Sequence, residues 1–96
     1  MGTRQEFELT RQDLIVGHVY EAKKKQTNFC REINDRQILW IGKEFYKNEY
    51  QEVIQYDSPT VRAGSHYPKV SVAQFLKWAK SDVTDEMPKG EWRTSF

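Results

Sequence analysis

The sequence predicts an α+β, mainly β, fold in which a small bent antiparallel sheet is followed by one late helix. Apolar residues alternate at strand spacing in the segments before residue 68. A single helix-periodic apolar face then follows at Val72, Phe75, Leu76 and Ala79. The 96 residues are enough for one domain with a modest core.

Three segments before the helix are typical of strands. Residues 16–24 alternate, residues 36–41 form the strongest strand pattern and end at Gly42, and residues 52–56 precede a turn signal. Residues 60–62 are expected to add a short fourth strand. The polar segments between these strands predict loops or hairpin tips.

The late helix is expected over about residues 71–81. Ser71 suits the N-cap position, and Gln74 stands three residues later, which is the spacing of a capping box. The apolar face of this helix is expected to pack on the strands, against Ile38, Trp40, Val53 or Ile54. Trp40, Tyr56 and Phe75 are expected in the core.

The order of strand, long loop, strand, tip, strand, turn, short strand and helix resembles SH3-like small barrels. The resemblance covers roughly residues 14–80 and consists of pattern alone. An OB-like five-strand barrel and an α+β roll are the alternatives. Residues 1–13 are interpreted as a lead-in, residues 14–82 as the domain, and residues 83–96 as a tail.

Composition excludes some classes of function. Charged residues make up 30% of the chain, yet the net charge is only +1, so a strong global field for nucleic acid or membrane is absent. No apolar run approaches the ~20 residues that a membrane span needs, and no membrane partner is expected. The single cysteine, Cys30, excludes an internal disulfide, fits a cytoplasmic location, and is expected to be half-buried in its loop.

Positive charge is concentrated in two segments, residues 23–36 and 58–80. If they share one face, they would form a nucleic-acid-binding surface. The candidate residues are Lys23, Lys24, Lys25, Arg31, Arg36, Arg62 and Lys69. The simpler interpretation is that these charges only keep a small domain soluble.

Aromatic residues are concentrated in a predicted loop tip and in the tail. Phe45, Tyr46 and Tyr50 crowd residues 43–50, and Trp92 lies in the tail. Exposed aromatic residues often anchor protein interfaces, so these four are candidate protein-binding residues. Alternatively, the tip folds back over an open barrel end. We expect the tip and the tail to cover each other or to mediate self-association.

The sequence contains no pattern typical of an enzyme. His18 and His66 are the only histidines, and a pair such as His66 with Asp57 would still need a nucleophile or an activated water. No catalytic residue, metal site, cofactor or small-molecule substrate is predicted. The leading hypothesis is a non-enzymatic cytoplasmic binding module that contacts a protein through the aromatic loop and a barrel edge. Nucleic-acid binding through the two basic segments is the alternative.

Overall fold

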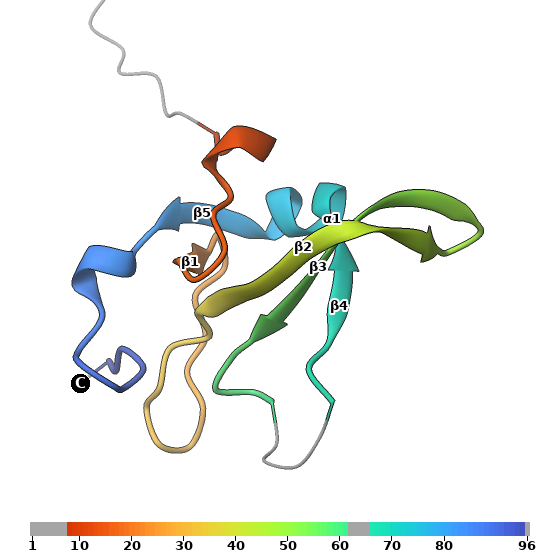
Figure 1. Cartoon of the computed structure of the whole chain (residues 1–96). Coiled ribbons are helices and arrows are strands. Elements are labelled where there is room, and N and C mark those ends of the chain that lie inside the picture. The colour runs from red at the N-terminus through yellow and green to blue at the C-terminus, as the bar shows by residue number, and fades with distance from the viewer. Residues whose placement is uncertain (1–7, 62–65, 96) are drawn as a thin grey trace, which may run out of the picture.

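The computed structural model describes residues 8–61 and 66–95, and Figure 1 shows their arrangement. The strands are β1 (Val19–Ala22), β2 (Arg36–Tyr46), β3 (Glu49–Asp57), β4 (Lys69–Ser71) and β5 (Ala79–Asp82). The helix α1 spans Val72–Trp78, and two single 3-10 turns, η1 (Arg11–Asp13) and η2 (Thr84–Glu86), flank the sheet in sequence. One antiparallel sheet with one α-helix confirms the predicted α+β, mainly β, class.

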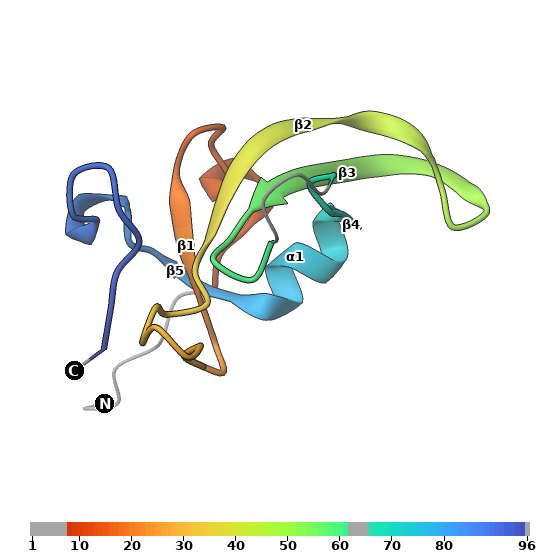
Figure 2. The same cartoon turned by 90° about the horizontal axis from the view of Figure 1, so that it is seen from below.

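The strands are arranged in the order β4-β3-β2-β1-β5. The first four strands form a meander. The last strand, β5, pairs with the edge of β1 that faces away from β2. The helix α1 connects the two edge strands, β4 and β5. Figure 2 shows the long β2–β3 hairpin curving over α1, so the helix lies on the concave side of a bent sheet.

The helix begins as the sequence predicts and ends earlier. The Ser71 side chain accepts a hydrogen bond from the backbone N–H of Gln74 at 3.1 Å, which confirms the N-cap. The expected end near residue 81 is wrong, because Ala79 is extended, with ψ of 139°, and starts β5. No glycine or proline marks this end, and the apolar Ala79 fits either the helix face or the buried side of a strand.

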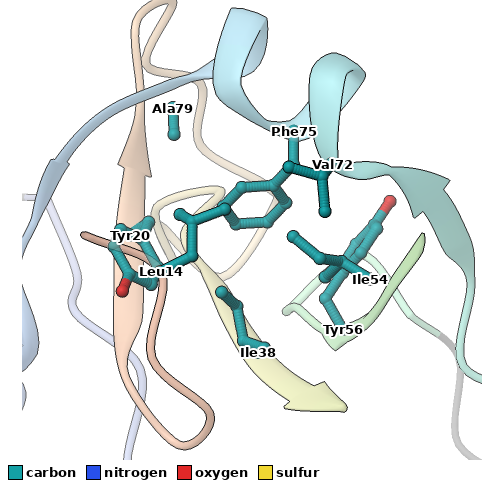
Figure 3. Close-up of a cluster of buried hydrophobic side chains, with 8 residues drawn as sticks. All are labelled: Leu14, Tyr20, Ile38, Ile54, Tyr56, Val72, Phe75 and Ala79. Carbon is teal, nitrogen blue, oxygen red and sulfur yellow. The ribbon is translucent and has the colours of Figure 1, made fainter. Parts of the chain in front are cut away.

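The core lies between α1 and the sheet, as Figure 3 shows. Its buried residues are Leu14, Tyr20, Ile38, Ile54, Tyr56, Val72, Phe75 and Ala79. Phe75 is at its centre, fully buried, with its ring centroid 5.6 Å from that of Tyr20 and 5.2 Å from that of Trp78. The predicted packing of the helix face on Ile38 and Ile54 is therefore confirmed.

Trp40 lies outside this core, and the expectation that it would be buried is wrong. The register between β2 and β3 shifts between Ile38 and Trp40, which is a β-bulge. The extra residue reverses the alternation, so Ile41 packs against the core and Trp40 is 39% exposed. The Trp40 ring folds over Gly42, where an added Cβ would lie 2.2 Å from the ring.

One predicted loop tip and one predicted strand also differ from the structure. Residues 43–50 do form a hairpin tip, but it is almost all strand, and only Lys47 and Asn48, which both have positive φ, form the turn between β2 and β3. Residues 59–61 form a turn rather than a fourth strand, with the N–H of Val61 donating to the carbonyl of Ser58 at 2.9 Å. The fourth strand is β4, which directly precedes the helix.

The segment after β5 packs against the β1–β2 loop. The Ile33 N–H donates to the carbonyl of Arg93 at 2.9 Å, and the Ser95 N–H donates to the carbonyl of Arg31 at 2.8 Å. The guanidinium of Arg93 donates to both carboxylate oxygens of Asp35, at 2.8 and 2.9 Å, and Asp35 is 0% exposed. A buried ion pair therefore joins two segments that are distant in sequence.

Candidate functional site

The end of the β2–β3 hairpin exposes two aromatic side chains. Phe45 and Tyr50 are directly opposite each other in the ladder, so both point to the same face. They are 71% and 68% exposed, respectively. Figures 1 and 2 both show this hairpin extending beyond the rest of the sheet. Together these two residues, called the tip pair below, form a projecting apolar surface.

One edge of the same hairpin has no partner strand. β2 pairs with β1 only at Arg36 and Gln37, and Ile38 adds backbone hydrogen bonds to residues 17 and 18. From residue 39 to residue 46, no strand of the part of the chain that the structure describes pairs with this side of β2. Unpaired N–H and C=O groups along a strand edge are a template for another strand. The bulge near residue 39 and the charge of Lys43 limit unselective pairing there.

Tyr46, the third residue of the predicted tip, faces the other side of the sheet. Its hydroxyl donates to the carbonyl of Lys69 at 3.2 Å, so its side chain is fastened to β4. Lys69 in turn binds Glu44 at 3.1 Å, with its Nζ 5.5 Å from the centroid of the Trp40 ring. Side-chain contacts therefore hold this face of the hairpin against β4, whereas the tip pair on the other face stays largely exposed.

Trp92 lies far from the tip pair. It is half-buried and lines a pocket of about 400 Å³ with Gly17, Gln37 and Asp57 among its walls. In both views the C-terminal segment and the hairpin tip are on opposite sides of the molecule (Figures 1 and 2). The expectation that tip and tail cover each other within one chain is wrong, because the tail packs on the β1–β2 loop instead.

Six of the seven candidate basic residues fall into three groups. Lys23 and Lys69 bind carboxylates, with Nζ of Lys23 3.3 Å from Glu8. Lys24 and Lys25 are exposed, and Arg31 is exposed in the tight turn of the β1–β2 loop, where its φ is 65°. Arg62 lies outside the described residues. Cys30, in the same turn, is exposed, so the half-buried position expected for it is wrong.

Arg36 differs from the other basic residues. Its guanidinium carbon lies 4.3 Å from the centroid of the Tyr56 ring and 4.1 Å from that of the Trp78 ring. Burial lowers the pKa of this guanidinium, although the charge on the arginine remains. Arg36 also lines a pocket of about 310 Å³. The other residues of this pocket are Lys24, Gln26, Asn34, Ser58, Thr60 and Trp78.

None of the contacts between charged or titratable side chains was predicted from the sequence, and two of them hold the C-terminal part of the fold. The buried Arg93–Asp35 pair is one, and the other joins Nδ1 of His18 to Asp82 at 2.7 Å. Partial burial disfavours the charged form of Asp82, but the hydrogen bonds from His18 and Thr84 outweigh it and lower the pKa of this carboxyl. The contact between His18 and Asp82 therefore links β5 to the segment before β1.

Several further features bear on function. Within residues 8–61 and 66–95, no three His, Cys, Asp or Glu side chains gather where they could hold a metal ion. Over the same residues, none of the helices has the length and apolar character needed to cross a membrane.

No protein-family model, curated protein or solved structure matches this chain. Its function is therefore inferred from the surfaces of the fold.

Proposed function

We propose that this protein is a non-enzymatic binding module that captures an extended protein segment at the β2–β3 hairpin. The observation that carries this proposal is the tip pair, in which Phe45 and Tyr50 are adjacent, on one face and largely exposed. Large aromatic residues are enriched among the residues that dominate binding energy at protein interfaces. Here they project from strands that are already paired in a ladder, so binding would cost little further backbone entropy.

The unpaired edge of β2 supplies the second half of this surface. An extended segment that pairs with residues 39–46 would satisfy the backbone groups on that side by strand addition. Side chains of this segment that point toward the tip-pair face would reach Phe45, since Ile41, Lys43 and Phe45 share one face of β2. Main-chain hydrogen bonds would supply general affinity, and the aromatic pair would supply selectivity.

A second copy of the chain is one protein that could occupy this edge. Two β2 edges that pair antiparallel would be related by a two-fold axis and would bury both tip pairs. Sedimentation over a range of protein concentrations separates this case from a foreign partner. A dimer that the double variant Phe45→Ser/Tyr50→Ser loses would make self-association the function of the edge.

The experiment for a foreign partner starts from extended peptides selected for binding from a random library. Phe45→Ser/Tyr50→Ser should weaken the selected peptides by at least about tenfold. Phe29→Ser is the matched control, because Phe29 is also exposed but lies in the β1–β2 loop. Bound peptide should also slow amide exchange along residues 39–46. Peptides that bind the double variant as tightly as the wild type would refute the proposal.

Nucleic-acid binding is the second candidate function. The observation that favours it is that Lys24, Lys25 and Arg36 lie close in the fold and bind no carboxylate among the described residues. Such binding should weaken steeply with salt, whereas peptide capture at an apolar tip should not. If Lys24→Glu/Lys25→Glu leaves binding to oligonucleotides at about 50 mM salt unchanged, this candidate fails. Both candidate functions include a cytoplasmic location, which is proposed because the single cysteine excludes an internal disulfide.

A further inference from the structure

The pocket beside Arg36 is built from segments that are far apart in sequence. Lys24, Gln26 and Asn34 come from the β1–β2 loop, Ser58 and Thr60 from the turn after β3, and Trp78 from the end of α1. Its volume of about 310 Å³ is at the lower end of the range of small-molecule sites. None of its seven lining residues carries a carboxylate, and two are cations.

Arg36 has a charge that nothing in the described structure balances. Arg11 and Arg93 each donate two or more hydrogen bonds to carboxylates, whereas Arg36 makes no ion pair. Its aromatic contacts stabilise the cation only in part, since a cation–π contact is worth about 0.5–2 kcal/mol. A partly buried and unpaired cation is costly, and an anion beside it would recover that cost.

None of the carboxylates around this pocket pairs with Arg36. Asp35, next to Arg36 in sequence, binds Arg93. Glu32 lines a smaller adjoining pocket and accepts a hydrogen bond from Nδ2 of Asn28 at 2.9 Å. Oδ1 of Asp57 accepts from the N–H of Ser58 at 2.8 Å, and Asp57 lines the Trp92 pocket instead. No acidic side chain of the described residues therefore competes for Arg36.

The N–H groups of Arg36 are open to solvent. No fully buried side-chain nitrogen or oxygen of the described residues lacks a hydrogen-bond partner. Because Arg36 donates no side-chain hydrogen bond to the described residues, its N–H groups must be accessible to solvent, and Arg36 is one of the residues that line the pocket. The two aromatic rings fix the plane of the guanidinium, which leaves its edge for an incoming acceptor. A planar fork of this kind matches two oxygens of one anion.

We propose that this pocket binds the phosphate monoester group of a small molecule. Arg36 would hold two phosphate oxygens, and the ammonium of Lys24 would supply the second positive charge that a dianion favours. The Ser58 hydroxyl accepts from Thr60 at 3.3 Å and keeps its own proton for a third oxygen. The remaining volume, bounded by Gln26 and Trp78, would accommodate the organic part. This site is separate from the hairpin surface proposed above for protein binding.

The test is calorimetric titration with inorganic phosphate, phenyl phosphate, dimethyl phosphate and an oligothymidylate. Phenyl phosphate should bind at one site, tighter than dimethyl phosphate, which carries one charge and two blocked oxygens. A monoester that binds better than inorganic phosphate would show that the organic part is held as well. An oligothymidylate that binds more tightly than either, with a steep salt dependence, would replace this proposal by a nucleic-acid surface.

Single variants locate the site. Arg36→Lys keeps the charge but loses the fork, and should weaken phenyl phosphate binding by about tenfold. Lys24→Gln should weaken it several-fold, and Lys24 is exposed, so folding is not at risk. Lys25→Gln is the matched control, because Lys25 is exposed and does not line the pocket. Equal weakening by Lys24→Gln and Lys25→Gln, or no saturation by about 10 mM ligand, would overturn the proposal.

Discussion

Replacing Arg93 by Met should destabilise the domain by about 3–5 kcal/mol, because it leaves a buried carboxylate without its partner. Asp35 is 0% exposed, and both of its oxygens accept from Arg93. Those hydrogen bonds raise the pKa of Arg93 above its ordinary value, so the arginine is charged at every pH at which the protein folds. The expected loss is a large share of the ~5–15 kcal/mol that stabilises a typical domain.

The assay is thermal and urea unfolding of a double-mutant cycle. At about 4–8 °C per kcal/mol, Arg93→Met should lower the melting temperature by more than about 10 °C. Asp35→Asn/Arg93→Met should be more stable than Arg93→Met alone, because the second change removes the stranded charge. Glu86→Gln is the control: Glu86 also binds Arg93, at 3.1 Å, but its side chain is 65% exposed. Its loss should cost less than about 1 kcal/mol.

Two outcomes would refute this reasoning. One is a melting temperature for Arg93→Met within about 2 °C of the wild type, because an uncompensated buried charge should lower the free energy of unfolding by much more than this. The other is a double variant no more stable than Arg93→Met, which would show that the loss comes from packing of the C-terminal segment. In that case Asp35 would gain solvent or a new partner when Arg93 is removed.

Three further predictions concern the core, the helix and the response to pH. Phe75→Ala should cost about 3–5 kcal/mol, because Phe75 is fully buried among aromatic rings, and a melt unchanged within about 2 °C would remove it from the core. Ser71→Ala should cost about 1 kcal/mol through loss of the N-cap, while Ser71→Thr, which keeps the capping hydroxyl, should cost less. The pKa of Asp82 is lowered, so its stabilisation is present above about pH 4 and is lost as pH falls through its folded-state pKa. Urea unfolding between about pH 5 and 2 should therefore show a steeper loss for the wild type than for Asp82→Asn, and parallel curves would contradict this.

Local signals in the sequence predicted the parts of the fold that depend on near neighbours. The start of α1 needs only Ser71 and the residues after it, and the burial of Phe75 follows from a helical period within that segment. The end of α1 could not be predicted, because Ala79 becomes a strand residue only through its pairing with β1. The face of the sheet on which the Trp40 side chain lies depends on a β-bulge, and no residue type in this segment predicts that bulge.

The candidate sites divide in the same way. The crowding of Phe45 and Tyr50 in one segment was visible, and Asn48 was a signal for the hairpin turn that places them opposite each other. The pocket beside Arg36 was not visible, because its residues come from two loops and the end of a helix. Asp35 and Arg93 are 58 positions apart, and only the tertiary fold brings them into contact.

The contact between Gly42 and Trp40 has a consequence for how this sequence can evolve. Gly42 has no positive φ that would require glycine, and it sits within a continuous strand. The space for its Cβ is filled by the indole of Trp40. A side chain at position 42 therefore requires that the indole of Trp40 move away or that position 40 carry a smaller residue. Among descendants of this sequence a change at position 42 should therefore be accompanied by a smaller residue at position 40 or by a new position of the aromatic ring.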